Sequence, residues 1–352
     1  MPRSTALAAL CAALLLTVPA QAATKSVYMG VPASSQKAFA NLGADVNAYF
    51  PGTITIRRGD KVRFLPVGFH DVDLPPRGRA PMQLLTDSGP IAGASDANGV
   101  PYWFNGQQAL QFTPALLSSN YGRTASYDGS RGTVSGIPLG NNLKPFTVRF
   151  TKTGTFTYYC NIHAGMKGKV RVLGGGKAPS AKADAKTVKR DVKAALADAK
   201  ALQSVRIPAN TIQVGNSSNS GVEVYAMFPS QMTVPAGTTL TFALSRYSKD
   251  LHTATTGPGD PETPGTFLGG LASSISSAGP IDQQGVYPSD PRQGPAPLGV
   301  SSHGNGFWNS GFMDTTTATD LPKSAQVRIV TPGTYTFFCL LHPFMQVTVT
   351  AT

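Results

Sequence analysis

The sequence predicts an all-β protein built from two tandem sandwiches, and two observations carry that prediction. Residues 50–64 match residues 228–242 at a constant offset, and both stretches alternate apolar and polar side chains as half-buried strands do. The chain also carries 37 Gly and 28 Pro, and turns such as Arg58-Gly59-Asp60 separate the strand-like stretches. Several short strands in each unit favour a sandwich.

The N-terminal residues have the pattern of a secretory signal. Arg3 precedes an apolar run over residues 6–18, and small residues at Ala20 and Ala22 follow as at a cleavage site. The run is too short to span a bilayer, and no longer one follows it. We therefore expect residues 1–22 to be a cleaved signal peptide. The mature chain is then expected to be secreted or periplasmic, with no transmembrane anchor.

The mature chain divides into two similar units and a linker. We assign residues 23–176 to the first sandwich and residues 204–352 to the second. Between them, residues 177–203 are rich in Ala, Lys and Asp. Apolar side chains recur there at helical spacing, at Val188, Val192, Ala195, Leu196, Ala199 and Leu202. We expect an amphipathic helix that docks along one of the sandwiches.

Each unit carries the motif C-x-x-H-x-x-M directly after a strand-like run. A thiolate, an imidazole and a thioether on one loop, with a second imidazole from upstream, are the ligands of a mononuclear electron-transfer copper. Each unit offers one upstream histidine shortly after its matched strand. The candidate metal ligands are His70, Cys160, His163 and Met166 in the first unit, and His252, Cys339, His342 and Met345 in the second.

Two structural alternatives compete with the metal interpretation. Cys160 and Cys339 are the only cysteines of the mature chain, and a disulfide between them would suit an oxidising compartment. However, the repeat places each in the same position of a separate unit, which favours metal-bound thiolates. Single His and Met residues most often serve packing. A duplicated set that uses four of the five histidines, leaving only His303, is harder to assign to packing.

On these motifs both units resemble the cupredoxins, the small blue copper proteins, and residues 342–345 are similar to the ligand loop of amicyanin. The resemblance implies an eight-stranded Greek-key sandwich in each unit. It also implies a type 1 copper at one end of each, beneath an apolar patch through which the loop histidine passes electrons. The same eight residues would bind the two coppers.

The units are larger than the compact cupredoxin pattern. The excess lies in Gly-, Ser- and Pro-rich inserts at residues 75–142 and 255–317, which we expect to be mostly loop. Long loops are often functional, so these could cover the copper or form a docking surface. Short matches, residues 135–137 with residues 310–312, suggest that the inserts are related to each other.

The leading functional hypothesis is outer-sphere electron transfer between redox partners, without substrate chemistry. A secreted copper carrier ranks second, because the remaining methionines do not cluster. A copper oxidase or nitrite reductase ranks third, because catalytic copper needs further histidines, commonly as H-x-H, and only His303 is unassigned.

Charge suggests what kind of partner to expect. The formal net charge is +12, and residues 23–176 carry most of the excess of Lys and Arg. Export argues against nucleic acid, so the basic first unit is expected to meet an acidic redox protein or an anionic envelope surface. Solubility alone is an equally good explanation of the charge. Oligomeric state and reduction potentials do not follow from the sequence.

Overall fold

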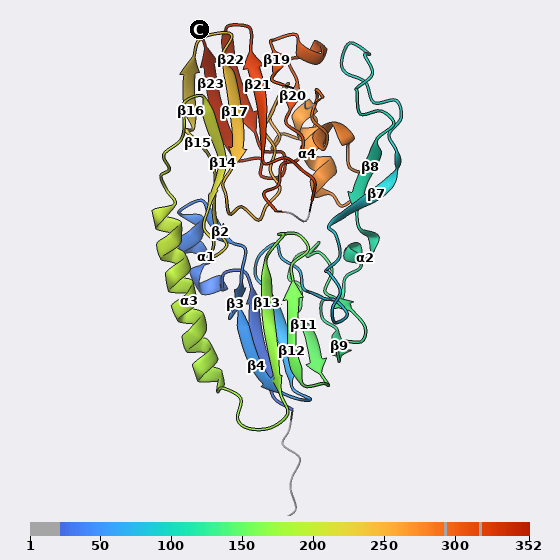
Figure 1. Cartoon of the computed structure of the whole chain (residues 1–352), viewed down its shortest axis with the longest axis vertical. Coiled ribbons are helices and arrows are strands. Elements are labelled where there is room, and N and C mark those ends of the chain that lie inside the picture. The colour runs from blue at the N-terminus through green and yellow to red at the C-terminus, as the bar shows by residue number, and fades with distance from the viewer. Residues whose placement is uncertain (1–21, 292–293, 317–318) are drawn as a thin grey trace, which may run out of the picture.

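A computed structural model describes residues 22–291, 294–316 and 319–352. The predicted signal peptide lies outside them except for Ala22. Two β-sandwiches stack along the long axis of the molecule, and a long helix runs beside the first and reaches the edge of the second (Figure 1). The predicted all-β class with two sandwiches is confirmed.

The first sandwich pairs two five-stranded sheets around one apolar core. One sheet has the order β3 (Tyr49–Phe50), β1 (Thr24–Met29), β5 (Lys61–Pro66), β11 (Phe146–Phe150) and β9 (Thr124–Tyr127). The other has the order β10 (Thr133–Val134), β6 (Asp73–Leu74), β12 (Gly154–Tyr159), β13 (Lys167–Leu173) and β4 (Thr53–Arg57). Alternate residues such as Val62, Phe64 and Val170 fill the space between the sheets.

The second sandwich repeats this arrangement. Its larger sheet has the order β19 (Ala296–Leu298), β21 (Ser324–Ile329), β17 (Thr239–Leu244), β14 (Thr211–Ser217), β15 (Val222–Phe228) and β2 (Ala44–Val46). The facing sheet has the order β16 (Gln231–Val234), β23 (Gln346–Ala351), β22 (Gly333–Phe338), β18 (Thr255–Thr256) and β20 (Trp308–Asn309). In both sandwiches the first strand pairs in parallel with the strand that follows the turn of the repeat, at residues 58–60 or 235–237. Thus β1 pairs with β5, and β14 pairs with β17.

One strand crosses between the two units. β2 comes from the segment assigned to the first unit, yet it pairs antiparallel with β15 of the second sandwich, with Val46 opposite Val222. A boundary drawn by sequence position therefore does not separate two independent bodies. The two sandwiches share a sheet edge.

The linker helix α3 (Ala181–Ala201) forms where the apolar spacing predicts it. It begins at Ser180, whose hydroxyl accepts the Ala183 amide at 3.2 Å, as an N-cap residue does. Its buried face is Val192, Ala195 and Ala199, which packs with α1 (Ala33–Ala40), β2 and β15. The helix docks as expected, but against elements of both sandwiches and not of one, because β2 and α1 bring part of the first unit beside β15.

The two inserts pack against each other, and they are mostly loop, as expected, with short helices and strands between the loops. The first contains β7 (Leu85–Pro90), β8 (Gln108–Phe112) and α2 (Pro114–Leu117). The second contains α4 (Phe267–Ser276), η1 (Gln283–Gly285) and η2 (Ser302–Gly304). The β7–β8 hairpin rises beside α4 (Figure 1). Buried residues of both inserts form one core, which contains Ile91, Tyr102, Phe104, Leu268, Leu271, Phe307 and Phe312.

Polar contacts also join the inserts. The Trp103 indole donates to the Pro288 carbonyl at 2.9 Å. The His303 imidazole lies between two carboxylates, 3.5 Å from Asp96 and 3.6 Å from Asp290. Thus His303, which sequence analysis leaves unassigned, lies at the contact between the inserts.

Candidate metal centres

The two C-x-x-H-x-x-M loops adopt the same backbone turn. In the first, the Cys160 amide donates to the Met166 carbonyl at 3.1 Å, and the Met166 amide donates to the His163 carbonyl at 3.0 Å. In the second, the equivalent bonds are 3.0 Å from Cys339 to Met345 and 2.8 Å from Met345 to His342. The spacing of the motif thus produces a closed loop between two antiparallel strands, β12 and β13 in one unit and β22 and β23 in the other.

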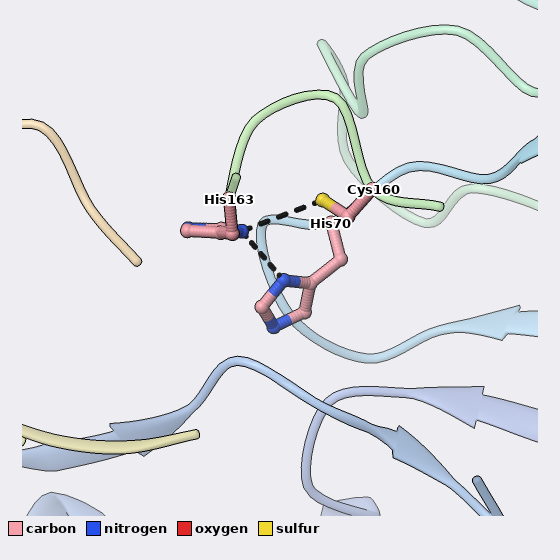
Figure 2. A group of neighbouring side chains, drawn as sticks. All are labelled: His70, Cys160 and His163. Atoms are coloured by element: carbon pink, nitrogen blue, oxygen red, sulfur yellow. Dashed lines mark hydrogen bonds between the residues drawn. The ribbon is translucent and has the colours of Figure 1, made fainter. Parts of the chain in front are cut away.

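In the first unit this loop meets the predicted upstream histidine. Figure 2 shows His70, Cys160 and His163 converging from two loops. The Nδ1 atoms of His70 and His163 are 2.9 Å apart, and the Cys160 sulfur lies 3.5 Å from His163 Nδ1. All three side chains are buried.

The second unit repeats this arrangement. The Cys339 sulfur lies 3.6 Å from His252 Nδ1 and 3.7 Å from His342 Nδ1. Cys339 and His252 are buried, and His342 is half-buried. The structure therefore brings together the cysteine and both histidines that sequence analysis selected in each unit.

The donor atoms are spaced as one small ion requires. A first-row metal binds imidazole nitrogen at about 2.0 Å and thiolate sulfur at about 2.3 Å, so such ligands in one trigonal plane lie roughly 3.5–3.7 Å apart. The three sulfur–nitrogen distances fall in this range. The nitrogen–nitrogen distance in the first unit is shorter, and a bound ion would need His70 and His163 to separate slightly. The residues fit a copper ion.

Met166 and Met345 complete the candidate sets. Each is buried at the end of its loop and belongs to the same core cluster as the cysteine of its unit. Both cysteines are free and lie in separate sandwiches, so no disulfide joins them.

The same serine contact holds the strand beside each upstream histidine. In the first unit the Val72 amide donates to the Ser135 hydroxyl at 2.9 Å, and the Ser135 amide returns a bond of 2.8 Å to the Val72 carbonyl. In the second, Ala254 and Ser310 exchange the same two bonds at 2.8 and 3.0 Å. The short match between the inserts therefore marks equivalent positions, and these serines fix the segments that carry His70 and His252.

The far nitrogen of each histidine has a different environment. His70 Nε2 is buried without a hydrogen-bond partner among the described residues, and its ring lies in a slot whose walls are Gly30 and Gly68. A Cβ at either glycine would come within 2.9 Å of the ring. His252 Nε2 is instead 3.0 Å from the buried carboxylate of Glu223.

The loop histidine of the first unit contacts the other sandwich. His163 Nε2 lies 2.9 Å from the carboxylate of Asp250, which is two positions before His252. Sequence analysis identified neither Asp250 nor Glu223 as part of a site. No repeat signal could find Asp250, because Gly68 occupies the equivalent place before His70.

Local charge sets the protonation of these groups. Burial opposes charge on His163, but Asp250 and the Cys160 sulfur outweigh it and raise the pKa of His163 well above its usual range. Burial alone would raise the pKa of Cys339, yet hydrogen bonds from His252 and His342 hold it well below its usual range. Burial raises the pKa of the Cys160 thiol, and the nearby charge of Asp71 adds to this. The second unit therefore favours the thiolate more strongly.

Both loop histidines line one cavity between the sandwiches. It measures about 350 Å³, and His163, Asp250 and His342 lie on its wall. The remaining lining is mostly apolar and includes Phe69, Leu84, Ile137, Leu139, Ile162, Leu251, Leu340 and Leu341. Beside it Phe344 is 58% exposed and Phe69 is 54% exposed. The two candidate centres thus share an apolar vestibule.

Solved structures similar to this chain include plastocyanins, auracyanins and pseudoazurins. An oxidised plastocyanin from Dryopteris crassirhizoma is 22% identical over 40% of this chain and 99% of its own, with a TM-score of 0.22. A reduced auracyanin from Roseiflexus castenholzii is 15% identical over 40% of this chain and 94% of its own, with a TM-score of 0.24. Auracyanin A from Chloroflexus aurantiacus, a "blue" copper protein, is 15% identical over 40% and 96%, with a TM-score of 0.23.

The TM-scores of these matches are too low to support a conclusion about the fold. The fold is therefore assigned from the strand order and the loop geometry. No sequence-family model and no curated protein matches the chain. Within the described residues, no helix has the length and apolar character needed to cross a membrane.

Proposed function

We propose that this protein carries single electrons between redox partners and uses two type 1 copper sites to do so. The observation that supports the proposal most is the duplicated set of one cysteine sulfur and two histidine Nδ1 atoms, in which all but the half-buried His342 are buried and the sulfur–nitrogen distances suit one ion. Copper cycles between Cu(II) and Cu(I) in such a set with little change in its ligands.

Each residue has a distinct part in this proposal. The thiolates of Cys160 and Cys339 provide the strongest ligand and the most direct electronic connection to each strand. His70 and His163 in one unit, and His252 and His342 in the other, would hold the ion together with the thiolate. Met166 and Met345 would supply a weak thioether ligand. The buried surroundings exclude water, so the ligands do not have to compete with it.

The protein around the ligands holds them in place. The Gly30–Gly68 slot orients the ring of His70, and Glu223 orients that of His252. Partners that hold the second nitrogen of a ligating histidine fix both its tautomer and its direction. A rigid ligand set of this kind favours electron transfer, because little rearrangement accompanies the change in charge.

We extend the proposal to compartment and partners. Two thiolates kept for metal in an otherwise cysteine-free mature chain suit an exported protein, in the periplasm or outside the cell. The basic first unit suits acidic redox proteins. A copper carrier role is the alternative, and an oxidase or nitrite reductase role is a weaker one.

Copper titration of the mature protein tests the proposal. The wild type should bind two Cu(II) ions and become strongly blue, whereas Cys160→Ala and Cys339→Ala should each bind one. His303→Asn serves as the control, since it changes a histidine outside both sets and should leave copper content unchanged. A colourless protein, or one copper in the wild type, would refute the two-site assignment. Turnover of oxygen or nitrite would refute the carrier role.

A further inference from the structure

Asp250 lies between the two candidate centres and contacts both sides. One carboxylate oxygen, Oδ1, accepts from His163 Nε2 at 2.9 Å. The other, Oδ2, accepts from the Tyr225 hydroxyl at 2.7 Å and from the Asn47 amide at 2.8 Å. The side chain is buried at 4% exposure, and its two oxygens are therefore committed to three donors from three different segments.

Tyr225 continues this connection to the second centre. Its ring packs against the imidazole of His342, with centroids 4.7 Å apart and planes tilted by 45°. A continuous series of contacts thus runs from His163 through Asp250 and Tyr225 to His342. Each end of the series is a proposed copper ligand.

The connection is held rigidly. Asn47 directly follows β2, the strand that the first unit contributes to the sheet of the second, and Tyr225 lies on the neighbouring strand β15. The Tyr225 amide also donates to the Gly43 carbonyl at 2.8 Å. The pairing of β2 with β15 therefore fixes Asp250 and its partners in one arrangement.

The two ends differ in their access to the surface. His163 is 5% exposed, and its outer nitrogen is occupied by Asp250. His342 is half-buried and lies beside the exposed ring of Phe344, with ring centroids 6.3 Å apart. The loop histidine of the first unit is directed at the second unit, and that of the second unit is directed toward the surface.

We propose that Asp250 and Tyr225 form an internal electron relay between the two centres. This inference rests on the proposed function. One electron leaves the reduced first centre through His163 and reaches the oxidised second centre through His342. The first centre is thereby oxidised, and the second is reduced. No bond forms or breaks: the Asp250 carboxylate stays ionised, and the Tyr225 phenol keeps its proton. Electrons tunnel more readily through covalent and hydrogen-bonded atoms than across empty space. Two of the three contacts in this series, His163–Asp250 and Asp250–Tyr225, are hydrogen bonds, and the third is a ring contact.

Two variants test the relay without removing a ligand. Tyr225→Phe keeps the ring against His342 and deletes only the hydroxyl that meets Asp250. Asp250→Ala deletes the carboxylate itself. Tyr335→Phe is the matched control. It removes a partly buried hydrogen bond of 2.9 Å, from the Tyr335 hydroxyl to the Thr331 carbonyl, in the same sandwich as Tyr225. Copper content and the visible spectrum are measured first for every protein.

The decisive measurement is the redistribution of one electron inside the loaded protein. A pulse that supplies less than one electron per molecule is followed by rapid freezing, and the spin-resonance signals of the two centres are assigned from the single-cysteine variants. The wild type should show a redistribution rate independent of protein concentration. Removing a hydrogen-bonded partner of a ligand typically changes activity about 10- to 100-fold, so Asp250→Ala should slow this phase by at least about tenfold. Tyr225→Phe should slow it as well, because it breaks the next hydrogen bond of the series. Tyr335→Phe should not.

A second readout uses the metal-free protein. The ring N–H of His163 that faces Asp250 should give a slowly exchanging nuclear magnetic resonance signal. This signal should be lost in Asp250→Ala and retained in Tyr225→Phe, so the hydrogen bond is tested without copper.

The outcomes separate the relay from the proposed function. Failure of the wild type to bind two coppers would refute the function itself, before any kinetics. Two coppers with wild-type redistribution rates in Tyr225→Phe or Asp250→Ala would overturn the relay and leave the function standing. The same holds for a wild type with no concentration-independent phase. Should Asp250→Ala lose copper, Tyr225→Phe decides alone.

Discussion

The glycine slot around His70 gives a sharp prediction for the first centre. A Cβ at Gly68 would lie 2.7 Å from His70 Cδ2 and 2.9 Å from Nε2, whereas ordinary contact begins at 3.4 Å. In Gly68→Ala the ring must therefore move by about 0.7 Å, which exceeds the roughly 0.5 Å tolerance of a preorganised site. We expect this variant to lose the first copper and keep the second.

The same overlap should also weaken the metal-free fold. Inserting a methyl group into a packed site costs about 1–3 kcal/mol of unfolding free energy. Elemental analysis gives copper per chain, and chemical denaturation gives the free energy. Gly175→Ala is the control, because a Cβ there meets nothing within 4 Å. Two coppers per chain with an unchanged spectrum in Gly68→Ala would show that the slot does not position His70.

Three further predictions follow from other contacts. Glu223→Ala should weaken copper binding at the second centre roughly 10- to 100-fold, because His252 loses its partner. Glu262→Ala, at an exposed position, is the control and should not change the affinity. Equal affinities of the two variants in a competitive copper titration would contradict this. Hydrogen bonding to Asp290, helped by Asp96, raises the pKa of His303. Its stabilising effect should be full below pH about 6.5 and fade as pH rises through the raised pKa. Between pH 6 and pH 8 the free energy of unfolding, measured by chemical denaturation, should fall less in His303→Asn than in the wild type. An equal fall in both proteins would contradict this. Phe104→Ala should cost about 3–5 kcal/mol of stability, because a buried ring leaves the shared core of the inserts; a loss below 1 kcal/mol would contradict that packing.

The repeated features of the molecule were predictable from the sequence. The offset between the units predicts two sandwiches, and the C-x-x-H-x-x-M spacing predicts loops in which Cys160 and His163 approach each other. The upstream histidines follow the same matched strands, and the structure brings both to the cysteines. Periodicity also locates the helix α3 to within a few residues.

Features that belong to only one copy were not predictable. Asp250 contacts His163 across 87 positions of sequence and has no counterpart before His70. β2 is three residues long, too short to show a strand period, and its partner lies in the other unit. The inserts have ordinary loop composition, and only their mutual packing gives them an apolar core. Contacts between different parts of a chain leave no local pattern in either part.

The pairing of β2 with the second sandwich has a consequence for protein synthesis. Val46 leaves the ribosome long before its partner Val222, so β2 has to wait unpaired while the first sandwich and the linker are made. An unpaired strand of this kind is a template for unwanted association. Splitting the gene between the two units would leave β15 without its partner β2. The protein is therefore committed to being made and folded as one piece, although its sequence looks like two.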